Sequence, residues 1–341
     1  MAEVVKIVLT GGPCGGKTAA LEYISVELKK LNIPTITISE SASRLLSAGK
    51  TPENMGSYEF HRELFEMQLA EENEKTRDRK NARSKKRACG INSLSVRNSY
   101  DAVFHLVTSA DGAEEYYGKE TNIFRREDSL EKAREVDIDV MAVWTGTPHL
   151  RVIDNSTDFD TKLKRLLKEV VAFLGIPKPL EIERKFLIEY PDIEFLNSIK
   201  TCRRISITQA YLTTPDEGYF RIRRRGDGDK AVYIKTVKIK ISDIKRIEIE
   251  NYISKEQYDS YLAQRQYVTG IISKDRYCIV DNNTYYEHDV YPFWRDRATI
   301  EIELLSENQP YQLPSFVKLV REVTSEPIYR NLALAQKYGK P

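Results

Sequence analysis

Two groups of residues in this sequence have the types and the spacing that bind phosphate groups. The first is GGPCGGKT at 11–18, which has the G-x-x-x-x-G-K-T pattern of a phosphate-binding loop. Glycine lets main-chain N–H groups approach phosphate oxygens closely, and the positive end of a following helix favours an anion. We expect Lys17, the catalytic candidate, to reach the β- and γ-phosphates and the Thr18 hydroxyl to complete a Mg2+ shell. The predicted nucleotide-binding residues of this loop are Gly12, Pro13, Cys14, Gly15, Gly16, Lys17 and Thr18.

The second group consists of like-charged side chains that recur two residues apart on successive predicted strands. Alternate residues of a strand face the same side, so each pair shares one face and aliphatic residues take the other. A sheet with one solvated face is the alternative, but such faces usually mix polar residues, and stacked like charges repel. We expect one shared cavity, in which acids collect divalent metal and bases collect phosphates. The acids are Glu181, Glu183, Glu248, Glu250, Glu301 and Glu303, and the bases are Lys185, Arg221, Arg223, Lys235, Lys274 and Arg276.

The phosphate-binding loop needs a strand before it and a helix after it. The apolar pattern predicts a buried strand at 4–9, an amphipathic helix at 19–31 and a second strand at 35–38, the opening of a doubly wound α/β parallel sheet. The ligand crevice of such a sheet lies at the carboxyl ends of its strands. Later strands are predicted at 102–107 and 151–153, and helices at about 53–82, 129–141 and 157–174.

Several polar residues near this crevice have two interpretations each. Glu40 is either an active-site carboxylate or a neighbour of a helix N-cap. Arg125, beside Arg126, is either a lid arginine that contacts the phosphates or a surface residue. Asp154, beside Asn155, either contacts the base of a nucleotide or forms an Asx turn before the next helix. The basic run 75–87 either binds phosphates or is a solvated helix end, and no aromatic residue within it stacks on bases.

Length and composition predict a two-domain protein. A chain of 341 residues exceeds one average domain, and the helix stop and prolines of GIPKP at 175–179 place the boundary between domains 1–176 and 177–341. The net charge of +2 indicates no general affinity for nucleic acid, and the four separated cysteines suggest neither disulfides nor a zinc site. Without a leader or a long apolar run, we expect a cytoplasmic protein, with peripheral contact to an anionic membrane as an option.

The first half resembles the P-loop domain of the TRPL translocation defect protein family. The resemblance covers residues 4 to about 174 and lies in four stretches, which are GGPCGGKT, YDAVFHLVTSADGAEEYY, the A-x-W-x-G-x-P-H stretch at 142–149 and VIDNSTDF at 152–159. That P-loop (AAA) domain is itself similar to the nicotinamide riboside kinase part of bacterial NAD regulators. One departure concerns the metal: the family has an apolar strand ending in C-D-R-G, whose Asp acts as the Walker B group, and KKRACGINSLSVRN stands here instead. Phosphate binding by the loop should not need this segment. Hydrolysis or phosphoryl transfer at the loop is in doubt, because both require a metal ion held in position.

The second half resembles the CYTH or triphosphate tunnel metalloenzyme family, an eight-stranded antiparallel barrel with a charged lumen. LEIERKF at 180–186 matches the E-x-E-x-K motif, and the Arg-x-Arg, Lys, Glu-x-Glu, Lys-x-Arg and Glu-x-Glu elements follow in the family's order up to about residue 335. By resemblance, Glu181, Glu183, Glu301 and Glu303 would hold Mg2+ or Mn2+, with Glu248 and Glu250 assisting, and the six basic residues would grip a polyphosphate. Glu181 and Glu183 are the catalytic candidates. The aromatic stretch 289–297 departs from the family and is interpreted as a lid, a membrane-facing tip or packing.

The two resemblances together predict a regulatory protein. The translocation defect family couples a P-loop domain to a CYTH-like domain and is associated with GTP binding, phosphoinositide binding and membrane-protein trafficking. The expected function is therefore binding of GTP or ATP with Mg2+ in the first domain and of a phosphoinositide head group or polyphosphate in the second. The alternative is a metal-dependent tunnel triphosphatase acting on inorganic triphosphate or a nucleoside triphosphate. A substrate kinase is the third reading.

Overall fold

The computed structural model describes residues 4–38, 42–76, 100–118, 129–176, 180–214, 218–228, 231–242, 245–263 and 270–340. The chain divides into two compact units, Met1–Val140 with Ile153–Leu167 and Met141–Val152 with Lys168–Pro341. Within the described ranges, none of the helices combines the length and the apolar composition that a membrane span needs.

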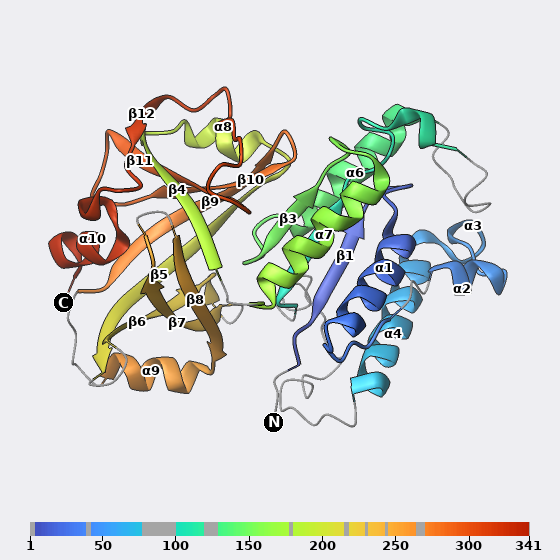
Figure 1. Cartoon of the computed structure of the whole chain (residues 1–341), viewed down its shortest axis with the longest axis horizontal. Helices are drawn as coiled ribbons and strands as arrows, with labels where there is room; N and C mark the ends of the chain where they lie inside the picture. The colour runs from blue at the N-terminus through green and yellow to red at the C-terminus, as the bar shows by residue number, and fades with distance from the viewer. Residues whose placement is uncertain are drawn as a thin grey trace. The chain divides into compact units, whose positions relative to one another are not determined.

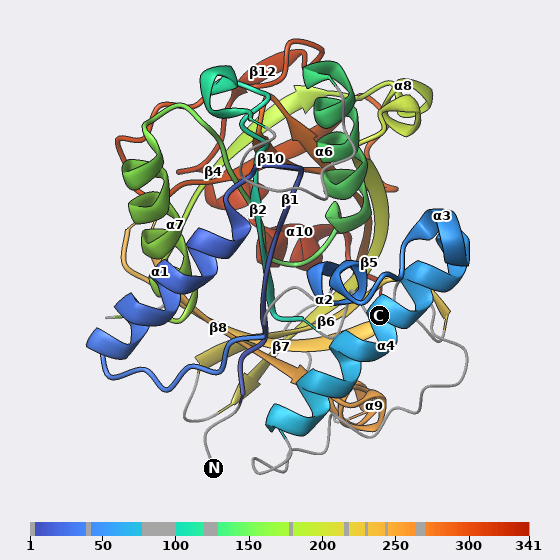
Figure 2. The same cartoon turned by 90° about the vertical axis from the view of Figure 1, so that its right-hand side faces the viewer.

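The N-terminal part contains a parallel three-stranded sheet with helices around it. Its strands are β1 (Ile7–Gly11), β2 (Ala102–Leu106) and β3 (Leu150–Ile153), in the order β1-β2-β3. Strand β2 is buried along its whole length, as expected for a central strand covered on both faces. Figure 2 shows α1 and α7 on one side of β1 and β2, and α6 and α4 on the other. The helices are α1 (Lys17–Lys30), α2 (Ala42–Ser47), α3 (Pro52–Met55), α4 (Ser57–Thr76), α6 (Leu130–Trp144) and α7 (Phe159–Phe173), with a 3-10 turn η2 (Glu114–Tyr116).

Two predicted elements of this part differ from the structure. Residues 35–38 form no strand, and Ile36 is 43% exposed, so the partner of β1 is β2, far along the chain. The long helix predicted at 53–82 is interrupted at Gly56, whose φ of 85° is not helical, and so becomes α3 and α4. The expected β-α-β opening is therefore wrong, because two apolar residues in alternation do not ensure a covered face.

The C-terminal part contains an antiparallel sheet that closes on itself (Figure 1). The sheet order is β11-β10-β9-β5-β6-β7-β8-β4-β12, and β11 also pairs with β4, so eight strands form a barrel and β12 is added beside β4. The strands are β4 (Leu180–Glu189), β5 (Cys202–Thr214), β6 (Gly218–Arg225), β7 (Val232–Lys240), β8 (Lys245–Ile253), β9 (Ile272–Asp281), β10 (Thr284–Val290), β11 (Arg297–Glu303) and β12 (Leu319–Glu322).

The apolar core of this unit lies on the outer face of the barrel wall. Figure 1 shows α8 (Ile193–Ser198), α9 (Lys255–Ala263) and α10 (Asn331–Tyr338) against the strands, and a 3-10 turn η5 (Pro327–Tyr329) precedes α10. One cluster joins Phe186, Ile188 and Ile300 to Leu196 of α8. Another joins Phe220 and Ile222 to Tyr258 of α9. With one face of each strand used for this packing, the charged residues in alternate positions face the barrel interior.

Candidate functional site

The glycine-rich loop leads from β1 into α1. Gly16 is the N-cap of α1 and has a φ of 85°, and a Cβ at this position would lie 2.5 Å from the ring of Phe159. Lys17 Nζ donates to the carbonyl oxygens of Gly11 and Gly12 at 3.0 and 2.8 Å. The Thr18 side chain is exposed. The local geometry thus requires glycine at 16 for both conformation and space.

Buried polar residues hold this loop in place by hydrogen bonds. Asp137 accepts a hydrogen bond from the Gly12 N–H group and lies 3.0 Å from Nε2 of the buried His105. Lys162 Nζ donates to the Val107 carbonyl at 2.9 Å and to Asn155 Oδ1 at 2.6 Å, and burial lowers the pKa of Lys162 to about 8. Asp137 therefore joins the loop to α6, and Lys162 joins it to α7 by also donating to the Gly15 carbonyl at 3.4 Å.

Three residues with predicted roles near the loop are Asp154, Arg125 and Glu40, and the structure describes only the first of them. Asp154 accepts hydrogen bonds from the Ser156 N–H group and from Arg165, so its side chain forms the Asx turn that was one of the two interpretations. Arg125 lies outside the described residues, as do Glu40, most of the basic run 75–87 and the interval expected to lack the Walker B group. Nucleotide binding at 11–18 therefore stays a prediction.

The barrel interior holds the predicted charged pairs of the second half. Lys185 on β4 is paired across the closing strands with Glu301 on β11, and their side-chain atoms lie 2.5 Å apart. Arg276 on β9 binds Glu301 at 2.8 Å and Asp289 at 2.7 Å, and Lys274 also contacts Asp289. All five side chains are buried, and burial together with Arg276 lowers the pKa of Lys274 to about 8 despite its contact with Asp289.

Two arginines of β6 form a second interior group. Arg221 lies 3.2 Å from both Glu248 and Glu250 on β8, and Arg223 lies 3.0 Å from Glu250. The arginines are 8% and 9% exposed, and the Nε atom of each is buried without a hydrogen-bond partner. Burial and Arg221 lower the pKa of Arg223, whereas Arg223, opposed by burial, lowers the pKa of Glu250 well below its usual range. Buried guanidinium groups with unused donors are the chemistry that receives phosphate oxygens.

The third interior group contains the acidic residues of β4. Glu181 lies 3.1 Å from Lys238 and 3.4 Å from Arg246, and Lys238 lies 2.6 Å from Glu248. Burial and Glu248 raise the pKa of Glu181 well above its usual range, and burial and Glu301 raise the pKa of Glu183. Glu303 pairs with Glu183 in the strand register, and its side chain is 34% exposed. These carboxylates crowd one another, which favours a cation between them.

The acidic residues fit a divalent metal ion in their donor chemistry. Carboxylate oxygens are the hard donors that Mg2+ and Mn2+ prefer, and burial raises the pKa of Glu181 and of Glu183, an effect that a bound cation would oppose. Among the described residues, no three His, Cys, Asp or Glu side chains are grouped as metal ligands, and Lys238 and Arg246 contact Glu181.

Lys235 differs from its prediction, and several charged interior residues were not predicted. Lys235 Nζ lies 4.5 Å from the centre of the Phe220 ring, on the outer face with the α9 cluster. Lys238, three residues later on β7, has the interior position instead. Among the residues missed are Lys238, Arg246, Asp289 and Glu287, and Glu287 contacts Arg276. Strand alternation could have identified Lys238 from the sequence. Thr236 and Lys238 share one face of the strand, and Tyr233, Lys235 and Val237 share the other.

The aromatic stretch 289–297 packs against the rest of the unit, which was one of its three interpretations. Tyr291 is fully buried, its ring lies 5.1 Å from those of Phe293 and Trp294, and it packs on Leu334 of α10. Its hydroxyl donates to Asn331 at 2.6 Å. The stretch therefore joins the C-terminal helix to the barrel wall.

Comparison with known proteins supports the fold predicted for the second half of the chain. Residues 179–325 match the family model of the CYTH domain. Among solved structures, the chain is similar to an inorganic triphosphatase, with 29% identity, a TM-score of 0.31 and coverage of 47% of this chain and 97% of that one. It is also similar to a Hippeastrum protein named an adenylyl cyclase that has a dominant triphosphatase activity (16% identity, TM-score 0.26, 37% and 80% covered) and to an RNA triphosphatase from S. pombe (16%, 0.23, 42% and 79%). No curated protein matches the chain.

The CYTH match and the closed antiparallel barrel confirm the predicted fold of the second half. The resemblance of residues 4–174 to the translocation defect family stays a prediction, as do GTP and phosphoinositide binding and a trafficking role.

Proposed function

We propose that the barrel is a metal-dependent triphosphatase acting on inorganic triphosphate or on a nucleoside triphosphate. The observation that carries the proposal is the pair of arginines on β6, which are buried in the interior with unpartnered Nε donors. Their glutamate partners on β8 leave these Nε donors unused, and a buried donor without a hydrogen bond is costly. The match of residues 179–325 to the CYTH domain supports the same reading.

The basic residues would bind the phosphate chain. Arg221, Arg223 and Arg276 offer planar, multidentate donors to non-bridging phosphate oxygens, and Lys185, Lys238 and Lys274 add point charges. In the structure their partners are glutamates and Asp289 of neighbouring strands, so a phosphate chain would share or replace contacts that are already ionic. The cations are thus held in place before substrate arrives, which lowers the reorganisation needed at the transition state.

The acidic residues would hold the metal ion and the attacking water. Glu181, Glu183 and Glu248 are the best-placed donors for Mg2+ or Mn2+. A bound divalent ion neutralises charge on phosphoryl oxygens and lowers the pKa of water. In the reaction, an oxygen–phosphorus bond forms from water, the bridging bond to the terminal phosphorus breaks, and orthophosphate leaves with the shortened polyphosphate. A neighbouring carboxylate accepts the proton.

The glycine-rich loop is proposed as a second phosphate site, for GTP or ATP with Mg2+. Its support is local: Gly16 begins α1 in a conformation that favours glycine, and Lys17 lies over the loop carbonyls. A nucleotide bound at this loop would regulate the activity of the barrel and would take no part in the reaction there.

Phosphate release by the full chain tests the barrel proposal. We expect release from inorganic triphosphate, ATP or GTP that requires Mg2+ or Mn2+, and loss of this release in Glu181→Gln. With inorganic triphosphate as the substrate, a Lys17→Ala variant serves as a control, because it alters the proposed nucleotide site and leaves the barrel unchanged. Absence of release from all three substrates with either metal, in a folded protein, would overturn the proposal. Tight binding of triphosphate or phosphoinositide vesicles without release would support the regulatory reading instead.

A further inference from the structure

Lys162 of α7 is a buried cation whose hydrogen bonds all go to uncharged oxygens. Its side chain is only 2% exposed. Its Nζ donates to the Val107 carbonyl at 2.9 Å, to Asn155 Oδ1 at 2.6 Å and to the Gly15 carbonyl at 3.4 Å. Among the residues that the structure describes, no carboxylate lies within ion-pair distance of this ammonium group.

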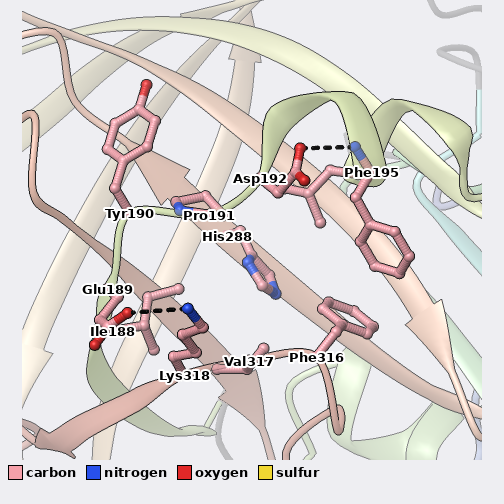
Figure 3. A pocket seen from close by; sticks show the side chains of 11 residues that line it. Ile188, Glu189, Tyr190, Pro191, Asp192, Phe195, His288, Phe316, Val317 and Lys318 are labelled. Carbon is pink, nitrogen blue, oxygen red and sulfur yellow. Dashed lines mark hydrogen bonds and ion pairs between the residues drawn. The ribbon is translucent and has the colours of Figure 1, made fainter.

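Other lysines have the acidic partner that Lys162 lacks. Lys274, which is buried in the barrel interior, contacts Asp289. Figure 3 shows the exposed Lys318 next to Glu189, at 3.5 Å, beside the cavity between β10 and α8. Burying a charge is costly unless an opposite charge compensates it. Lys162 therefore needs a counter-charge, and the glycine-rich loop beside it is the place where an anion is expected.

Two carboxylates act on Lys162 through space, but each is bonded elsewhere. Asp137 accepts a hydrogen bond from the main chain of the loop, and Asp154 accepts one from Arg165. Burial lowers the pKa of Lys162 to about 8, and Arg165 and Lys17 act in the same direction, whereas Asp137 and Asp154 oppose it. At neutral pH the ammonium group is thus charged, and the two carboxylates compensate its charge only in part.

The contact with Gly15 connects this charge to the loop. The Gly15 C=O and the Gly16 N–H belong to one peptide unit, and a trans peptide points these two groups in opposite directions. Because the carbonyl faces Lys162, the N–H points away from it, and a hydrogen bond at the carbonyl strengthens the N–H as a donor. Gly16 is the N-cap of α1, and none of the described side chains caps this helix end. The helix dipole and Lys162 therefore favour the same anion.

We propose that Lys162 is a positioning residue of the nucleotide site, whose charge acts through the Gly15–Gly16 peptide as the counter-charge of a phosphate group bound in the loop. This inference rests on the proposed nucleotide site at 11–18. Because protonation and binding are linked, a bound phosphate should raise the pKa of Lys162, and the site should take up a proton where Lys162 is partly neutral. The affinity is therefore highest below about pH 8 and falls as the pH rises through this value.

Isothermal titration calorimetry of the full chain with GDP and ADP can test this proposal, since a triphosphatase does not consume diphosphates. Binding that Lys17→Ala removes is assigned to the loop and is thereby separated from binding in the barrel. At pH 8, the difference in heat between Tris and HEPES buffers gives the number of protons taken up. If the phosphate raises the pKa of Lys162 by about one unit, we expect uptake of about 0.4 proton per nucleotide.

Two lysine variants of α7 complete the test. Lys162→Met should bind the nucleotide about tenfold more weakly at pH 7 and take up no proton at pH 8. Between pH 7 and 9.5, the unchanged protein should lose about sevenfold in affinity relative to this variant. Lys164→Met removes the same charge from an exposed position two residues later, so it should bind like the unchanged protein.

The possible outcomes separate this inference from the nucleotide site on which it rests. Absence of any binding that depends on Lys17 would overturn both. Binding that depends on Lys17 but occurs without proton uptake, or with equal affinity in Lys162→Met and Lys164→Met, would overturn the role of Lys162 alone. Proton uptake is measured in the unchanged protein, so it decides the question even where Lys162→Met fails to fold.

Discussion

Lys235 and Lys238 lie on the same strand, β7, but on opposite sides of the barrel wall. Lys238 contacts Glu181 and Glu248 in the interior, whereas Lys235 lies over the Phe220 and Tyr261 rings at 4.5 and 5.7 Å. The two residues are identical in type and three positions apart, so they provide a matched pair for testing the interior.

Lys238→Met should reduce kcat/KM for inorganic triphosphate by about 100-fold, the size of effect seen when one donor is removed from a preorganised site. Lys235→Met should change it by less than about twofold and affect only stability, by about 0.5–1 kcal/mol. Steady-state phosphate release and thermal unfolding of both variants make the comparison. Equal losses of activity in the two variants would contradict an interior role specific to Lys238.

Asp289→Asn should destabilise the protein strongly. Asp289 is fully buried and is the shared partner of Lys274 and Arg276, so its neutral substitute leaves two buried cations short of charge. Breaking such a buried pair costs about 3–5 kcal/mol, measurable as a lower midpoint in urea unfolding. Asp296→Asn, which removes the partner of Arg297 in an exposed pair, is the control and should leave the midpoint unchanged. Similar midpoints for the two variants would count against the buried network.

Acid should unfold the protein partly through His288. Its pKa is lowered by burial from 6.5 to about 4, so between these values the unfolded chain binds a proton that the folded protein excludes. The stabilisation present above pH 6.5 is therefore lost as the pH falls toward 4, by about 3 kcal/mol in total. Urea unfolding across this range should show a shallower pH dependence in His288→Phe than in the unchanged protein. Parallel curves would show that His288 does not titrate in this way.

Gly16→Ala should destabilise the first unit more than Gly49→Ala. Both glycines have positive φ, of 85° and 76°, but a Cβ at 16 would meet the Phe159 ring at 2.5 Å and a Cβ at 49 would meet nothing within 4 Å. Each change costs about 1–2 kcal/mol for conformation, and only the first adds a clash. Thermal unfolding should rank the variants, and Phe159→Ala should partly rescue Gly16→Ala. No difference between the two glycine variants would exclude the contact with Phe159.

The charged pattern of the second half was predictable because strand alternation fixes which residues share a face. Glu181 and Lys185, or Arg221 and Arg223, share a face whatever their partner strands are. The face that each strand turns inward depends on pairing: Thr236 is opposite Arg221, and Lys235 is opposite Ile222, so β7 presents Lys238 to the interior. The sequence alone gave no register for β6 and β7, and Lys235 was therefore misplaced.

The pairing of strands that are far apart in the chain could not be predicted from the sequence. Asp289 appeared to begin an aromatic stretch, and its role depends on β10 lying beside β9, where it is opposite Arg276. In the first half, the helices at 17–30 and 159–173 and the strand at 102–106 follow from periodicity. The strand predicted at 35–38 failed because burial depends on covering elements that local alternation does not specify.

The seam between β4 and β11 has a consequence for synthesis. Residues 183–189 are synthesised before their partners at 297–303, and the Lys185 N–H group donates to Thr324, 139 positions later. A nascent chain therefore carries an open, charged sheet with a free edge until β11 has been made. The glutamates and arginines that face the interior of the finished barrel are hydrated in this open state, and their charges oppose pairing of the free edge with another chain.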